Sequence, residues 1–89
     1  MTQTMETAEN RIKRMGMRSW RRGTKEMDMI LGPFSDDRLA AMDAADLDLY
    51  DALLLENDQD LYQWVSGQVA PPDRFADLIA RIADHAASK

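Results

Sequence analysis

The spacing of apolar residues near the C-terminus is the feature that most constrains the fold. These residues recur at the i, i+3, i+4 and i+7 positions that lie on one face of an α-helix: Phe75, Leu78, Ile79, Ile82, Ala83 and Ala86. Only six apolar residues of the chain are β-branched, and no Asn-Gly or Asp-Gly hairpin signal is present. We therefore expect the 89 residues to fold as one all-α domain.

Helix signals divide the N-terminal part of this domain into two helices. Apolar spacing predicts the first over about residues 7–19, and Gly23 then marks a turn. The second is predicted over residues 25–31, where Gly32-Pro33 ends or kinks it because proline lacks a backbone donor. Residues 1–10 are predicted to be a flexible N-terminal segment, and residues 11–87 the helical domain.

Two more helices are predicted between these and the C-terminal helix. Residues 43–55 form one, with the first residue as its N-cap. A shorter helix starts at Asn57 or Asp58 and ends at Gly67. Trp64 follows its apolar spacing and is expected in the core, as are Met29 and Met42. The sum is a compact five-helix bundle with short loops, expected to be a monomer.

The distribution of charge is uneven. The net charge is −5, which argues against nucleic-acid binding. Seven of the 11 Lys and Arg residues lie between Arg11 and Lys25, whereas nine acids and one base lie between Asp36 and Asp60. Such asymmetry indicates an interaction surface. The apolar runs are too short to cross a bilayer and no secretory signal is visible, so we expect a cytoplasmic protein that is not embedded in a membrane.

The usual catalytic and metal-binding patterns are missing. The chain has no cysteine, and its single histidine, His85, is expected to be exposed in the last helical turn. No HExxH, EF-hand or phosphate-binding glycine loop occurs. The acids of the middle segment are expected to be a solvated helix face and N-caps. We therefore expect no catalytic residue, no metal site and no stably bound cofactor.

One segment, residues 18–28, concentrates charge around a glycine. As an ordinary turn it would hold solvated charges, with a weak i, i+4 pair between Arg22 and Glu26. As a binding surface it offers arginines, two acids and a glycine that lets a partner's backbone approach closely. Trp20 within it is either an anchor for a partner or tucked under Gly23, and the sequence does not favour one.

The same segment resembles a known family. Residues 22–26, R-G-T-K-E, fit the RGxxE motif of the SdhE family, also called succinate dehydrogenase assembly factor 2, an FAD assembly factor. The likeness continues through Leu31 to Pro33-Phe34, and residues 60–64, D-L-Y-Q-W, resemble the family's D-L-aromatic-x-W segment. It covers roughly residues 11–82, and the second segment makes it far more specific than five residues alone.

The resemblance implies a five-helix chaperone of the bacterial cytoplasm that binds the flavoprotein subunit of succinate dehydrogenase, and in bacteria also that of fumarate reductase. It implies that the chain promotes covalent attachment of FAD to that partner and is not an enzyme. The predicted partner-binding residues are Arg22, Gly23, Glu26, Arg18, Trp20 and Asp28.

Two other functions are alternatives to this one. A small regulatory interaction module, similar to an antitoxin, would make the motif match accidental. An enzyme using Arg22 and Glu26 directly is disfavoured because so small a chain leaves little room for a supported pocket.

Overall fold

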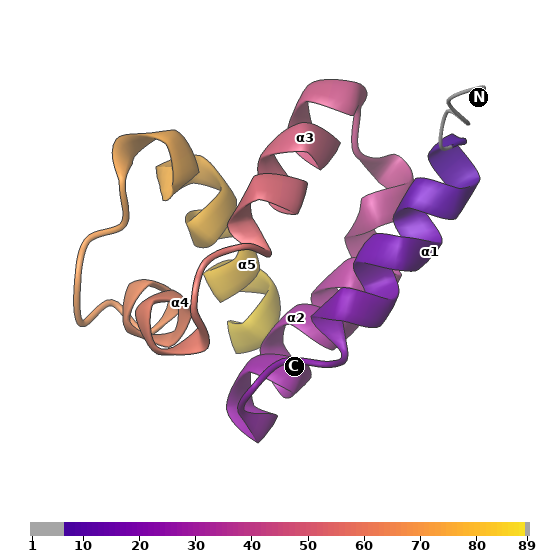
Figure 1. Ribbon diagram of the computed structural model, residues 1–89. Coiled ribbons are helices and arrows are strands. Elements are labelled where there is room, and N and C mark those ends of the chain that lie inside the picture. The colour runs from indigo at the N-terminus through magenta and orange to yellow at the C-terminus, as the bar shows by residue number, and fades with distance from the viewer. Residues whose placement is uncertain (1–6, 89) are drawn as a thin grey trace.

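The computed structural model describes residues 7–88 and confirms the all-α prediction (Figure 1). This part of the chain contains no strand. Its five α-helices are α1 (Ala8–Ser19), α2 (Lys25–Arg38), α3 (Ala44–Leu53), α4 (Asp58–Val65) and α5 (Ala76–Ala87). Two 3-10 turns, η1 (Leu39–Ala41) and η2 (Asp73–Phe75), precede α3 and α5.

Side-chain caps explain where four of the helices begin. In each, the N-cap oxygen accepts a hydrogen bond from the backbone N–H three residues later: Thr7, Thr24, Asp43 and Asn57. The choice between residues 57 and 58 as the cap of α4 therefore falls on Asn57. Gly67, with φ of 83°, follows α4 as predicted. Helix α1 starts at Ala8, inside the segment 1–10 that we predicted to be flexible, and residues 1–6 lie outside the described part.

Helix α2 does not end at Gly32-Pro33. It continues through Pro33 to Arg38, so the predicted boundary at residue 31 is wrong. Proline costs the helix one backbone hydrogen bond. Leu31 and Phe34, on either side of it, are buried, and this tertiary packing offsets the loss.

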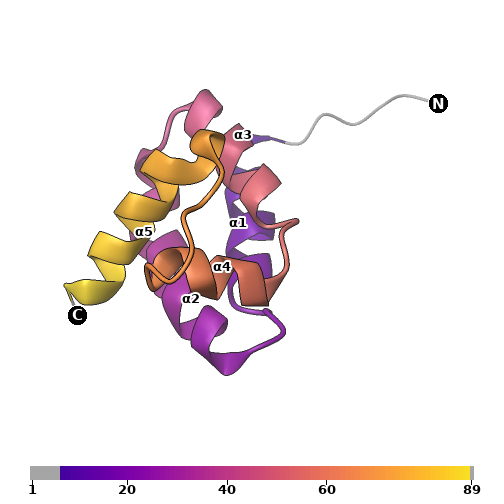
Figure 2. The ribbon, with the colours of Figure 1, turned by 90° about the vertical axis from the view of Figure 1, so that its left-hand side faces the viewer.

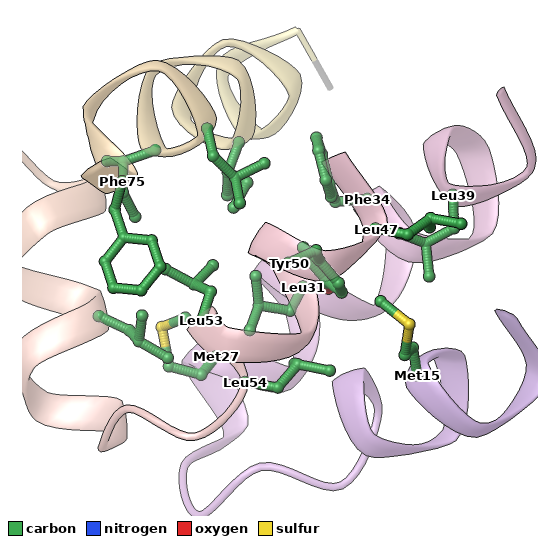
Figure 3. Packing of buried hydrophobic residues seen from close by; sticks show 14 residues of the cluster. Met15, Met27, Leu31, Phe34, Leu39, Leu47, Tyr50, Leu53, Leu54 and Phe75 are labelled. Carbon is green, nitrogen blue, oxygen red and sulfur yellow. The ribbon is translucent and has the colours of Figure 1, made fainter. Parts of the chain in front are cut away.

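The core is a single cluster of apolar side chains to which every helix contributes, which fits the single-domain prediction (Figure 3). Met15, Leu31, Tyr50 and Phe75 are all 1% exposed or less. Trp64, expected in the core, is only partly buried and packs at the core's edge, with its ring centroid 6.1 Å from that of Phe75.

The methionines divide differently from our expectation. Met29, expected in the core, is 59% exposed, and Met42 is only partly buried against the core. Met27, two residues before Met29 on the same helix, is fully buried.

Helix α2 is the central element of the bundle. It packs against α1, α4 and α5, and Figure 1 shows α1 and α2 side by side. After a turn of 90° the α1–α2 loop is seen directly beneath the start of α4 (Figure 2). Segments about 35 residues apart in the sequence therefore meet at this loop.

His85 is buried, and the prediction of an exposed histidine is wrong. Its side chain is 6% exposed, and Nε2 lies 2.6 Å from Oδ2 of Asp37 on α2. Its ring also makes an edge contact with Phe34, with centroids 5.6 Å apart. Apolar spacing in the last helix could not reveal this partner, because Asp37 is 48 residues away in the sequence.

Candidate partner-binding site at the α1–α2 turn

Arg22 lies in the loop between α1 and α2 and points into the molecule. Its side chain is only 9% exposed. Nε donates to Oδ1 of Asp58 at 2.6 Å, and the two terminal nitrogens donate to the carbonyl oxygens of Leu54 and Glu56 at 2.9 Å each. Because Leu54 and Glu56 follow α3, the guanidinium joins the α1–α2 turn to the α3–α4 turn and satisfies carbonyls beyond a helix end.

This geometry corrects one expectation about Arg22. It pairs with Asp58 and not with Glu26. Removal of one partner from a largely buried ion pair leaves the other charge uncompensated, so we expect loss of Arg22 to affect folding as well as binding. Asp28, another predicted partner-binding residue, takes part in the same structure, since its Oδ1 accepts a 2.5 Å hydrogen bond from the Arg22 backbone N–H.

Gly23 is exposed, but its backbone is not in the left-handed region. Among the described residues only Gly67 has a positive φ. The Gly23 N–H donates to Oδ2 of Asp58 at 2.5 Å, and a Cβ at position 23 would lie 2.7 Å from that same oxygen. A side chain at position 23 would therefore meet the Asp58 carboxylate, whereas the torsion angle does not call for glycine.

Glu26 is exposed, in the first turn of α2, where a carboxylate complements the helix dipole. It lines an open groove of about 520 Å³ between the start of α2 and α4. The other lining residues are polar or amphipathic: Thr24, Asp58, Gln59, Tyr62, Gln63 and Gln68. Of the motif's two charged residues at 22 and 26, Glu26 is the one free to meet a partner.

Arg18 and Arg21 form the other side of the turn. They line, with Arg14, Met17 and Arg22, an open groove of about 330 Å³. Both are exposed, and in residues 7–88 neither forms an ion pair. Arg21 was not among the predicted site residues, although its place in the arginine cluster was visible in the sequence.

Two other bases of α1, Arg11 and Arg14, form ion pairs with acids of α3. Arg11 donates to Asp48 at 2.5 Å, and Arg14 donates to both oxygens of Asp51. The hydrogen bond from Arg14 holds the pKa of Asp51 below its usual value of 3.8. The basic N-terminal segment and the acidic middle thus neutralise each other in part, which leaves the charge at Arg18 and Arg21 available.

Trp20 packs on α2 and not under Gly23. A Cβ at Gly32 would lie 2.3–2.6 Å from atoms of its indole ring, so the ring sits directly on the bare backbone of that glycine. Its Nε1 donates to Oδ1 of Asp36 at 3.3 Å. The indole is still 41% exposed, so its outer face can contact another protein.

Beneath the turn lies a buried polar pair that the sequence did not reveal. The Ser19 hydroxyl donates to the Met15 carbonyl oxygen at 2.8 Å and lies 2.6 Å from the Tyr50 hydroxyl. Burial raises the pKa of Tyr50 to about 12, against smaller opposing effects of Ser19 and Arg22. The pair fixes the end of α1 to α3.

In the described part of the chain no group of three or more His, Cys, Asp or Glu side chains is arranged to hold a metal ion. None of the described helices is both long and apolar enough to cross a membrane.

Known proteins match this chain over nearly its whole length. Residues 13–86 match the family described as the flavinator of succinate dehydrogenase. The mitochondrial succinate dehydrogenase assembly factor 2 of Meyerozyma guilliermondii is 39% identical over 77 residues, which covers 83% of this chain and 57% of the relative. The FAD assembly factor SdhE of Francisella tularensis is 36% identical over 64 residues, which covers 72% and 67%.

A third relative has the same description as the protein of Meyerozyma guilliermondii. The assembly factor 2 of Candida glabrata is 33% identical over 89 residues, which covers 94% of this chain and 58% of the relative. The chain therefore spans just over half the length of these two fungal relatives.

Proposed function

Since this chain belongs to the family described as the flavinator of succinate dehydrogenase, we propose that it binds the flavoprotein subunit of that enzyme and promotes covalent attachment of FAD to it. The observation that carries the proposal is the family match over residues 13–86, which includes the whole α1–α2 turn. The relative from Francisella tularensis, named an FAD assembly factor, supports the flavin part. Fumarate reductase's flavoprotein is proposed as a second client, and the bacterial cytoplasm as the location.

The proposed mode of action is binding. The turn offers exposed arginines on one side and Glu26 on the other, and its buried charges are already satisfied within the chain. We therefore assign no catalytic residue and no bound cofactor to this protein, which acts as a monomer. A helper that binds one conformer of its client more tightly than another raises the population of that conformer, and differential affinity limits the effect.

The proposed contact residues are Arg18, Arg21, Trp20 and Glu26. Each is exposed at or beside the turn. We assign a different role, keeping the turn in its conformation, to Arg22, Gly23 and Asp28. The sequence had predicted these three as partner-binding residues too. The contact surface is thus mainly charged, and binding is expected to weaken as salt rises because exposed charges are screened.

The test is covalent flavin on the succinate dehydrogenase flavoprotein subunit, measured by in-gel fluorescence with and without this protein. We expect a strong rise in covalent flavin when the wild-type chain is present. Equal fluorescence in both samples contradicts the proposal. Capture from a lysate separates it from the regulatory-module alternative, since the main partner must be the flavoprotein subunit.

A further inference from the structure

We propose that Asp58 is a positioning residue of this site: it fixes the turn that carries the motif, and it is the reason that position 23 must be glycine. The inference rests on the proposed function, because it explains how the contact surface receives its shape. Asp58 lies outside the RGxxE motif, 35 residues after Gly23.

The carboxylate of Asp58 accepts hydrogen bonds from two consecutive residues. Oδ1 accepts from Nε of Arg22 at 2.6 Å, and Oδ2 accepts from the backbone N–H of Gly23 at 2.5 Å. Asp58 is the first residue of α4, so the loop between α1 and α2 is tied to a helix that begins 35 residues after Gly23. Hydrogen bonds to a charged acceptor are the stronger kind.

The carboxylate has little freedom to move. Its side chain is 15% exposed, and Arg22, its partner, is itself held by the carbonyl oxygens of Leu54 and Glu56. A Cβ at position 23 would lie 2.7 Å from Oδ2, closer than real Cβ contacts come. The carboxylate could retreat only by giving up one or both of its hydrogen bonds, from Gly23 N–H to Oδ2 and from Arg22 Nε to Oδ1. An exposed glycine without a positive φ is thereby explained.

The two hydrogen bonds to Asp58 are expected to affect partner binding through Glu26. Thr24, the N-cap of α2, directly follows Arg22 and Gly23, so the position of these two residues sets where α2 begins. Glu26 lies in the first turn that follows, and it lines the same groove as Asp58. Loss of the two hydrogen bonds to Asp58 is therefore expected to displace Glu26 relative to Arg18, on α1, and Arg21, in the loop.

A rival explanation exists for Gly23. A glycine on a binding surface can be required because a partner's backbone comes close to it. In that case the glycine matters only in the complex, and the identity of residue 58 is irrelevant to the cost of replacing it. The two explanations therefore differ in whether positions 23 and 58 are energetically coupled.

The experiment measures Gly23→Ala in three backgrounds: wild type, Asp58→Ala and Asp58→Asn. The readouts are affinity for the purified flavoprotein subunit by titration calorimetry and the urea midpoint of the isolated chain. In wild type, Gly23→Ala is expected to weaken binding about tenfold or more and to lower the urea midpoint. In Asp58→Ala, which removes the carboxylate, it should cost about twofold or less.

Asp58→Asn is the matched control. It keeps an atom at the place of Oδ2 while removing the charge, so Gly23→Ala should stay costly there. Equal affinity losses in all three backgrounds, with unchanged urea midpoints on Gly23→Ala, overturn the proposal in favour of close approach by a partner.

The urea series needs no partner, which separates the two proposals. If the wild-type chain binds no flavoprotein subunit, the proposed function fails while the coupling between residues 23 and 58 is still measured. If Asp58→Ala does not fold alone, the wild-type and Asp58→Asn backgrounds decide: a midpoint that Gly23→Ala leaves unchanged in both overturns the proposal.

Discussion

The two charged ends of one five-residue motif have opposite environments. Arg22 is 9% exposed and donates to three acceptors contributed by the α3–α4 region. Glu26, four residues later, is exposed in an open groove. Residues of one motif therefore need not share one role. The inner end, Arg22, holds the turn through hydrogen bonds, and the outer end, Glu26, is exposed to solvent.

The largest effect is expected for the inner end. Arg22→Ala should lower the free energy of unfolding by about 3–5 kcal/mol, because it removes the charged partner of the part-buried Asp58 and the donors to the Leu54 and Glu56 carbonyl oxygens. This is a large fraction of the stability of so small a domain. Urea unfolding followed by circular dichroism measures it. Arg21→Ala, an exposed neighbour, is the control and should unfold like wild type. Equal curves for both variants would remove the distinction between the two ends.

A second effect on stability is expected at alkaline pH, and it comes from Tyr50, which lies beneath the turn. The pKa of Tyr50 is about 12 in the folded chain against 10 for the free group, so only the unfolded chain ionises between these values. Ionisation then favours the unfolded state, and the free energy of unfolding should fall by about 1.4 kcal/mol per pH unit above pH 10. Thermal melts from pH 9 to 11.5 measure it.

Tyr50→Phe is the control for this titration. It removes the ionisable group while keeping the ring that packs 5.8 Å from Phe34, so its stability should fall less steeply above pH 10. Parallel wild-type and variant profiles would show that Tyr50 is not the group responsible.

Trp20 is intermediate between the two ends, since one face is packed and the other is open. Gly32→Ala should destabilise the chain by about 1–3 kcal/mol, because the new methyl group displaces the indole from α2. Thermal unfolding and tryptophan fluorescence report the loss and the ring's movement together. Gly16→Ala is the matched control, since its nearest neighbour outside its own helix is 3.9 Å away. Similar melts would mean that the indole has room to shift.

The smallest effect on stability is expected at the outer end. Glu26→Ala should change the free energy of unfolding by about 0.5 kcal/mol or less, because it is exposed and alanine suits a helix. Binding of the flavoprotein subunit and covalent flavin should nevertheless fall strongly. Pull-down and in-gel fluorescence test this, with Gln59→Ala from the same groove as control. A folded Glu26→Ala protein with full activity would remove Glu26 from the contact surface.

Much of the fold follows from local sequence. Asp43 begins α3 and Gly67 follows α4 as predicted, because caps act on residues within one turn. The same local reasoning failed at Pro33, where burial on both sides keeps α2 intact. It failed again at His85, whose partner lies on another helix. Local signals describe single helices, whereas burial depends on what packs against them.

The site shows the same division. Its location could be predicted, since the glycine, the arginines and Glu26 are neighbours in the sequence. The sequence did not show that Arg22 turns inward, that Trp20 rests on Gly32, or that Asp58 takes part. Each of these depends on a contact between residues 12 to 36 positions apart.

What the sequence determined by itself is the helical class, most helix starts, and the stretch that carries the motif. Periodicity and capping are local, so the chain states them directly. Which charges are buried was decided only by the tertiary structure. Desolvating an arginine is costly unless fixed acceptors meet it, and the acceptors of Arg22 come together only when α3 and α4 pack beside the turn.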